Sequence, residues 1–80
     1  MAESTEARVR RMVADVLNLP PAQVTRETSP QTVPDWDSVQ HLNLVLAVEQ
    51  EFGVSVEPEQ IDKLRSVGDI VDAVEKMKGQ

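Results

Sequence analysis

The strongest pattern in the chain lies between residues 39 and 52. Apolar side chains there recur every three or four positions, which is the spacing that places them on one face of an α-helix. Gly53 follows directly and suits the left-handed conformation in which many helices end. Asp37 and Gln40 are three residues apart at the start, as in a capping box. We therefore predict a helix between Asp37 and Gly53. Its predicted buried stripe is Val39, Leu42, Val45, Leu46, Val48 and Phe52, thickened by Leu44.

A first helix is predicted near the start of the chain. Apolar residues between Glu6 and Leu19 follow the same spacing, and charged side chains fall between them. Ser4 or Thr5 can cap its start, because either hydroxyl oxygen can accept a hydrogen bond from a first-turn N–H. We expect Pro20 and Pro21 to stop it. Its predicted buried stripe is Val9, Met12, Val13, Val16 and Leu17.

The last third of the chain predicts two more helices. Pro58 suits the first position of a short helix that continues to Leu64. A longer helix is predicted from about Val67 to Lys78, and Ser66 with Asp69 would form a capping box at its start. The apolar stripe of this last helix is Ile70, Val71, Val74 and Met77.

Residues 20–36 predict a long ordered loop. They hold four of the five prolines together with several threonines and serines, and they show neither helical nor alternating spacing. A connection of this length is uncommon in a small domain and is often functional, although a crossover between two parallel helices would look the same. We expect Val24 and Val33 to fix the loop to the core.

These elements predict an all-α fold, a four-helix bundle with a long first loop and a short third helix. The 80 residues suffice for a single domain, residues 1–80, with a modest core. Apolar residues make up 40% of the chain but aromatics only 2%, so aliphatic side chains must supply the core. We expect the two ends, residues 1–3 and 79–80, to fray.

Composition excludes several classes of site. Without cysteine the chain has no disulfide framework, thiolate metal site or cysteine nucleophile. Its single histidine leaves no cluster for a transition metal, and we expect no metal site. The sequence contains no apolar signal core and no run near the roughly 18 apolar residues that span a bilayer. We expect a cytoplasmic monomer that does not associate with membranes.

The negative charge is concentrated in one part of the sequence. The formal charge is -6, and residues 27–62 contain eight carboxylates and no lysine or arginine. Such a surface repels nucleic acid and attracts basic protein patches. We therefore expect no nucleic-acid partner and instead enzymes with basic docking patches, although acidity also serves solubility.

Ser38 lies where the long loop enters the strongest helix. We expect its hydroxyl to be exposed, beside unpaired backbone N–H groups and the positive end of the helix dipole. A phosphate ester is favoured at such a position. A serine there can also serve simply as part of the helix cap.

The residues around Ser38 resemble the attachment motif of the acyl carrier protein family. The triplet Asp37-Ser38-Val39 opens an aliphatic helix that closes with the acidic stretch Glu49-Gln50-Glu51-Phe52-Gly53. The resemblance extends over nearly the whole chain, because that family has a four-helix bundle with a long first loop and a short third helix. It implies that Ser38 is the phosphopantetheine attachment site and Asp37 the acidic residue before it.

The resemblance also implies a function. In that family a phosphopantetheinyl transferase uses magnesium to move 4'-phosphopantetheine from coenzyme A to the serine. The thiol of this cofactor then holds acyl groups as thioesters for the enzymes of fatty-acid, polyketide or related specialised biosynthesis. The carrier itself is not an enzyme and has no catalytic residues.

The second helix is the usual recognition surface of the family. We expect partner contacts at six positions on it, three of which are uncharged or weakly basic where fatty-acid carriers often have acids. Partner choice can therefore differ from that of a fatty-acid carrier. These predicted contact residues are Val39, Gln40, His41, Asn43, Glu49 and Glu51.

Two alternatives use the same residues differently. Ser38 and His41, three residues apart on one helix, could act as nucleophile and base of a hydrolase. Such an enzyme would also need an oxyanion hole and a pocket, so we expect His41 to face solvent or a partner instead. The other alternative is an unmodified acidic helical module that binds proteins.

Trp36 and the cargo are left open by the sequence. Trp36 can anchor the end of the loop against the bundle, and it also resembles the residue that stand-alone carriers of specialised pathways have before the Asp-Ser pair. Several aliphatic residues could either line a pocket for an acyl chain or belong to the ordinary core. These residues are Leu42, Leu46, Ile61, Val67 and Val71.

Overall fold

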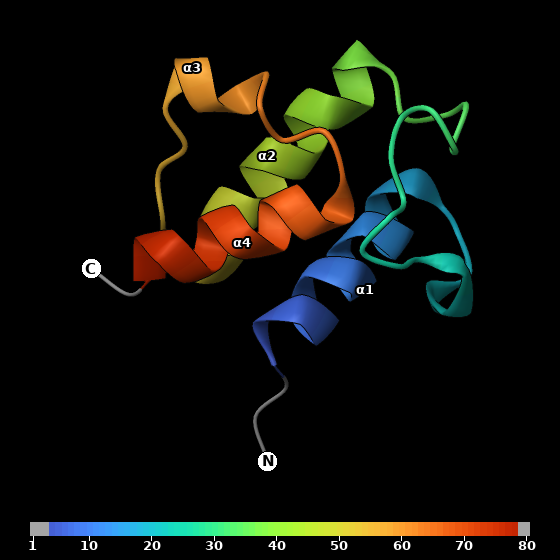
Figure 1. Ribbon diagram of the computed structural model, residues 1–80, viewed down its shortest axis with the longest axis horizontal. Helices are drawn as coiled ribbons and strands as arrows, with labels where there is room; N and C mark the ends of the chain where they lie inside the picture. The colour runs from blue at the N-terminus through green and yellow to red at the C-terminus, as the bar shows by residue number, and fades with distance from the viewer. Residues whose placement is uncertain (1–3, 79–80) are drawn as a thin grey trace.

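Four α-helices account for most of the computed structural model, which describes residues 4–78 (Figure 1). They are α1 (Thr5–Leu17), α2 (Ser38–Phe52), α3 (Pro58–Ile61) and α4 (Val67–Lys78), and a 3₁₀ turn, η1 (Pro21–Gln23), lies in the first loop. No strand occurs between residues 4 and 78. This arrangement confirms the predicted all-α fold. The predicted fraying concerns residues 1–3 and 79–80, which lie outside the described residues.

α1 begins as predicted but ends earlier. The Ala7 N–H donates to the hydroxyl of Ser4 over 3.1 Å, so Ser4 is the cap. The helix stops at Leu17 because Asn18 adopts a left-handed conformation with φ 57°. Asparagine tolerates this conformation better than most residues. The prediction that Pro20 and Pro21 stop the helix is therefore wrong.

Apart from Trp36 the core is aliphatic, and it is built around α1, which packs against both α2 and α4. Burying one such valine or leucine side chain contributes about 1.5–3 kcal/mol. The largest fully buried side chains of the core are Leu44, Ile70, Val9, Val13, Val24, Val67, Val71 and Val74.

The first loop is ordered, as predicted, because it is bonded to the start of α4. The N–H of Val67 donates to the carbonyl of Thr28, and the N–H of Gly68 donates to that of Arg26, both over 2.9 Å. A Cβ on Gly68 would lie 3.2 Å from the Arg26 oxygen, so glycine permits this approach. Val24 is fully buried and Val33 partly so, in line with their predicted role.

Arg26 adds a charged connection between the loop and two helices. Its guanidinium donates to Asp72 of α4 over 3.0 Å and to Glu6 of α1 over 3.1 Å. The hydrogen bonds to Asp72 and Glu6 raise the pKa of Arg26 above its usual value. The group is exposed to solvent, so we treat the pair as an orienting contact.

The faces of α2 differ from the prediction. Leu44, Val45 and Val48 are buried, whereas three residues of the predicted stripe point outward. The exposed residues are Val39, Leu42 and Leu46, with 67%, 52% and 55% of their surface accessible. The predicted end of the helix is confirmed, since Gly53 adopts φ 67°.

The capping boxes predicted for α2 and α4 form only by half. The Gln40 N–H donates to Asp37 Oδ1 over 2.9 Å, but the Gln40 side chain accepts from Asn43 instead of returning to Asp37. At α4, the Asp69 N–H donates to the hydroxyl of Ser66 as predicted. The Asp69 carboxylate, however, accepts from the N–H of Arg65, the residue before Ser66.

The third helix is shorter than predicted. α3 ends at Ile61, and the chain then turns so that Leu64 is buried outside any helix. Figure 1 shows α3 above α4 and to the left of the start of α2, at the end of an extended link from α2.

Candidate functional site

Ser38 is the first residue of α2 and is exposed, as the sequence predicts. Among the described residues, the N–H groups of Ser38 and Val39 make no hydrogen bond. These are two of the unpaired donors that every helix start leaves, and they carry the positive end of the helix dipole. An anionic group on the Ser38 hydroxyl would therefore lie in a favourable field.

Asp37 has a structural task beside this serine. Its carboxylate accepts the N–H of Gln40, and its carbonyl accepts the N–H of His41 over 2.8 Å. The side chain is otherwise exposed to solvent. The cap fixes the first turn of α2 and with it the direction of the Ser38 side chain. The predicted role of Asp37 toward the cofactor stays a prediction.

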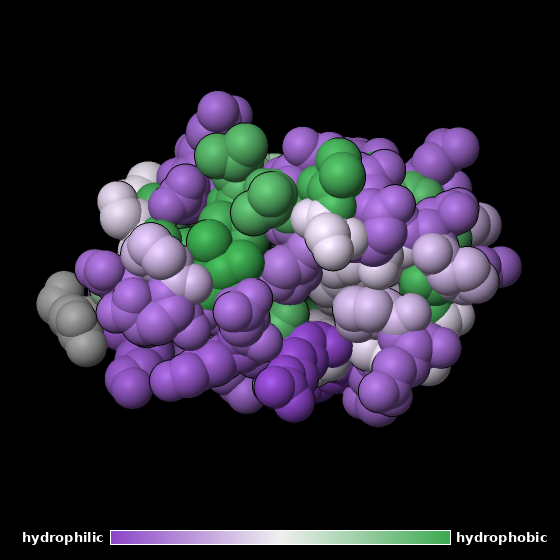
Figure 2. All heavy atoms as spheres, turned by 90° about the horizontal axis from the view of Figure 1, so that it is seen from above, coloured by the Kyte–Doolittle hydropathy of each residue, from purple (hydrophilic) through white to green (hydrophobic). Residues whose placement is uncertain are grey.

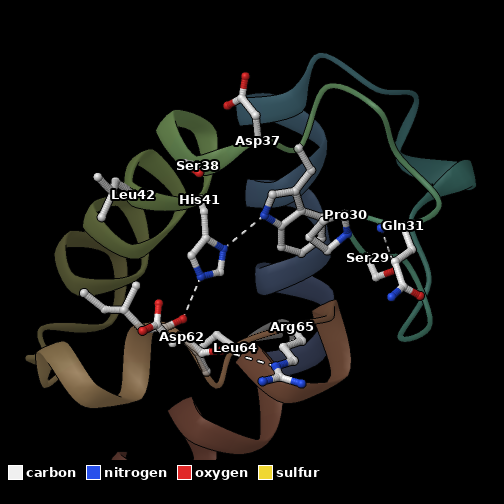
Figure 3. Close-up of a pocket in the computed structure, with 12 residues that line it drawn as sticks. Ser29, Pro30, Gln31, Asp37, Ser38, His41, Leu42, Asp62, Leu64 and Arg65 are labelled. Atoms are coloured by element: carbon white, nitrogen blue, oxygen red, sulfur yellow. Dashed lines mark hydrogen bonds between the residues drawn. The ribbon is translucent and has the colours of Figure 1, made fainter.

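A groove of about 910 Å³ opens beside Ser38. It lies between the end of the first loop, the first turns of α2, and the segment that follows α3 (Figure 3). Its apolar walls include the side chains of Trp36, Leu42, Ile61 and Leu64, whereas Asp62 and Arg65 add charge at one side. The groove is large enough for a slender flexible chain attached to Ser38.

His41 lies at the back of this groove and is bonded on both ring nitrogens. The indole Nε1–H of Trp36 donates to His41 Nδ1 over 3.0 Å, and His41 Nε2 lies 2.7 Å from the carbonyl oxygen of Ile61. Because an indole N–H can only donate, Nδ1 must accept, and the proton must be on Nε2. We call these two hydrogen bonds the His41 bridge; Figure 3 draws both as dashed lines.

The His41 bridge changes two expectations. His41 is partly buried and bonded on both ring nitrogens, so it does not simply face solvent, and a contact between His41 and a partner stays a prediction. Since Trp36 and Ile61 occupy both ring nitrogens, the imidazole is not available to take a proton from Ser38. The geometry therefore lacks the base that the hydrolase alternative needs. Trp36 retains 2% of its accessible surface, which confirms that it anchors the end of the loop.

An exposed apolar surface next to Ser38 was not predicted. Val39, Leu42 and Leu46 are spaced three and four residues apart and so lie along one side of α2; we call them the outer stripe. Figure 2 looks down on the side of α2 and α3 and shows apolar side chains at the surface among hydrophilic ones. The sequence signal for this surface is the width of the apolar region of α2. It covers more than one face of the helix and is wider than a single buried stripe.

The two predicted acidic contacts are engaged within the molecule. Glu49 accepts the N–H of Val56 over 2.8 Å. Glu51 accepts two hydrogen bonds from Arg8, at 2.7 and 3.1 Å, and the same guanidinium lies 4.5 Å from the ring centre of Phe52. Glu51 is 13 residues after Ser38, about 20 Å along the helix. The structure therefore does not bring these acids together with the serine.

The remaining predicted contacts lie close to Ser38. Asn43 is exposed, and Gln40 is partly exposed and bonded to Asn43 over 3.0 Å. Val39 belongs to the outer stripe. These positions stay predicted partner contacts. Between residues 4 and 78, no group of three or more metal-binding side chains comes together, and no helix is long and apolar enough to cross a membrane.

Comparisons with known proteins agree with this geometry. Residues 7–74 match the family described as phosphopantetheine attachment site. The chain is 36% identical over 67 residues to an acyl carrier protein of Thermosynechococcus vestitus, covering 84% of this chain and 83% of that protein. It is 35% identical over 71 residues to an acyl carrier protein of Porphyromonas gingivalis, covering 89% and 91%.

A solved structure resembles the fold as well. The solution structure of the holo acyl carrier protein from Geobacter metallireducens has a TM-score of 0.83 to this chain. The two share 29% sequence identity, and the match covers 94% of this chain and 86% of that one.

Proposed function

The chain belongs to the acyl carrier protein family, and we propose that residues 1–80 form a single carrier domain whose Ser38 receives the family's covalent 4'-phosphopantetheine. The observation that carries this assignment is the position of Ser38, exposed at the start of α2 on the edge of a long groove. When bound, the cofactor supplies a thiol that holds acyl groups as thioesters. The chain has no cysteine of its own to do so.

The residues around Ser38 fit a phosphate ester. The unpaired N–H groups of Ser38 and Val39 point along the helix axis, and the helix dipole stabilises an anion there by about 0.3–1 kcal/mol at an exposed site. The carboxylate of Asp37 is exposed and can turn its free oxygen to solvent while Oδ1 caps the helix. The chain thus orients the ester and leaves its far end mobile.

The protein's own contribution is presentation and not catalysis. His41 is held in its bridge and does not serve as a base toward Ser38. We therefore propose that a separate phosphopantetheinyl transferase modifies Ser38, and that enzymes of fatty-acid, polyketide or related specialised biosynthesis use the loaded protein.

The outer stripe is the surface that these partners would bind. Val39 follows Ser38 directly, and Leu42 lies one turn further on, so a protein whose active site reaches Ser38 covers both. Exposed carboxylates lie close by, since Asp37 and Asp62 line the same groove as Ser38 and Leu42. We propose that partners offer a small apolar patch bordered by lysine or arginine.

Intact-mass spectrometry tests the attachment site. The apo protein is incubated with a promiscuous phosphopantetheinyl transferase, magnesium and coenzyme A, beside Ser38→Ala and the matched control Ser55→Ala, which removes another exposed serine. Wild type and Ser55→Ala should gain one phosphopantetheine, and Ser38→Ala none. A folded wild type that gains nothing from an active transferase would favour the unmodified interaction module.

A further inference from the structure

α3 depends on α2 for its position. A helix of four residues is far below the length at which a helix is stable alone. Two side chains of α2 bond to the backbone just before α3 and at its end: Glu49 accepts the N–H of Val56, and His41 donates to the carbonyl of Ile61. Ile61 is the last residue of α3, and its carbonyl accepts the N–H of Leu64 over 3.3 Å as well as the shorter bond from His41.

The second bond of His41 ties this contact to the core. Trp36 is buried, and its indole N–H orients the imidazole ring by donating to Nδ1. The two rings are stacked, with centres 6.1 Å apart and planes inclined by 28°. The ring therefore has little freedom, and the direction of Nε2–H toward Ile61 is set from the side of the core.

The same three residues form one wall of the groove beside Ser38. Trp36, His41 and Ile61 all line it, and they come from the loop, α2 and α3 respectively (Figure 3). The His41 bridge joins the loop, α2 and α3 at this wall. A change in the bridge therefore changes the width of the groove.

We propose that His41 is a positioning residue: its bridge from Trp36 to Ile61 holds α3 where it shapes the groove that shelters an aliphatic acyl chain carried on Ser38. This inference rests on the proposed function, since it needs a cargo attached at Ser38. The apolar lining of the groove by Leu42, Ile61 and Leu64 is what fits it to an aliphatic chain. His41 contacts no reacting atom and acts through α3 and Trp36.

The bridge itself can be observed in the apo protein by NMR. Trp36 is the single tryptophan, so its indole N–H signal needs no further assignment. His41→Leu replaces the imidazole by an apolar side chain and removes both hydrogen bonds, whereas His41→Gln retains a donor and an acceptor. Exchange of the indole hydrogen with solvent should be about 2- to 10-fold faster in His41→Leu, and close to the wild-type rate in His41→Gln.

Protection of the acyl thioester by the groove is measured on the loaded protein with an octanoyl probe. Octanoyl-phosphopantetheine is transferred from octanoyl-coenzyme A, and the cleavage of its thioester by hydroxylamine is timed against free octanoyl-coenzyme A. We expect wild type to be cleaved more slowly than the free thioester, and His41→Leu to be cleaved about 2- to 10-fold faster than wild type. His41→Gln should restore protection. Gln50→Ala, an exposed change further along α2, is the control.

The outcomes separate the two proposals. If wild type accepts no octanoyl-phosphopantetheine, the proposed function fails. If wild type is loaded but His41→Leu and wild type are cleaved at the same rate, this inference is overturned while the carrier assignment stands. Should His41→Leu fail to fold by circular dichroism, Trp36→Phe removes the indole donor alone and must also increase the cleavage rate; an unchanged rate contradicts the inference.

Discussion

Trp36 and His41 lie on either side of Ser38 in the sequence and are joined by a hydrogen bond of 3.0 Å from the indole to the imidazole. This bond connects the last turn of the loop to the first turns of α2. The backbone at Ser38 is thus held in place although the serine side chain is exposed. A rigid backbone at this position suits the presentation of a flexible cofactor, because partners then bind a preorganised attachment point.

Trp36→Ala should strongly destabilise the protein. The indole is almost fully buried, and replacing a buried tryptophan by alanine costs about 3–5 kcal/mol. Trp36→Phe keeps most of the apolar contact but leaves His41 Nδ1 without its donor. This variant should lower the free energy of unfolding by about 1–3 kcal/mol. Urea unfolding followed by circular dichroism measures both. Equal losses for the two variants would contradict the role assigned to the hydrogen bond.

Leu42 and Leu44 test the two faces of α2 with the same chemical change. Leu44 is 1% exposed, so Leu44→Ala should lower the free energy of unfolding by about 2–5 kcal/mol. Leu42 is 52% exposed, and Leu42→Ala should change it by less than about 0.5 kcal/mol. Thermal or urea unfolding of the pair gives the comparison. A large loss for Leu42→Ala would mean that the outer stripe is buried in solution.

The outer stripe also predicts an effect on partners. Leu42→Ala should reduce kcat/KM of the phosphopantetheinyl transferase through a higher KM for the carrier, because contact area is lost while Ser38 is unchanged. Gln50→Ala, on the exposed side of the helix further from Ser38, serves as the matched control. A loss confined to kcat would point to a displaced serine instead.

Asp37→Ala should loosen the start of α2. Removing the side chain that accepts the Gln40 N–H costs about 1 kcal/mol of stability. Asp37→Asn retains an oxygen acceptor and should lose less than the alanine variant. Unfolding experiments on the two proteins measure the difference, and identical stability of wild type and Asp37→Ala would show that the cap contributes nothing.

Gly53→Ala tests the end of the same helix. Gly53 adopts φ 67°, a conformation that costs a residue with a Cβ about 1–2 kcal/mol. No atom lies within 4 Å of where that Cβ would stand, so the cost is one of backbone conformation and not of packing. Gly53→Asn should be less damaging than alanine. A neutral Gly53→Ala would indicate that the turn takes another conformation in solution.

The helix order and the position of Ser38 followed from local signals. Periodic apolar residues, prolines and capping residues act over a few positions, so they can be recognised in the sequence. The two capping boxes were predicted in full but form only by half, since the return bond of Gln40 or Asp69 depends on competing neighbours such as Asn43 and the N–H of Arg65.

The parts that the sequence did not reveal depend on tertiary contacts. α2 has two apolar faces, and the packing of α1 decides which of them is buried. The spacing of apolar residues in the sequence does not distinguish the two faces. The His41 bridge joins residues 36, 41 and 61, and its distant member, Ile61, contributes a carbonyl that every residue has. The engagement of Glu51 by Arg8 spans 43 positions and was likewise beyond local pattern.

The most direct test of the carrier assignment is to locate the added group on the wild-type protein. Trypsin cleaves after Arg26 and Lys63, so one peptide, residues 27–63, contains Ser29, Ser38 and Ser55. After treatment with transferase, magnesium and coenzyme A, fragmentation of this peptide in the mass spectrometer should place one phosphopantetheine on Ser38. An unmodified peptide, or a group on Ser29 or Ser55, would contradict the assignment.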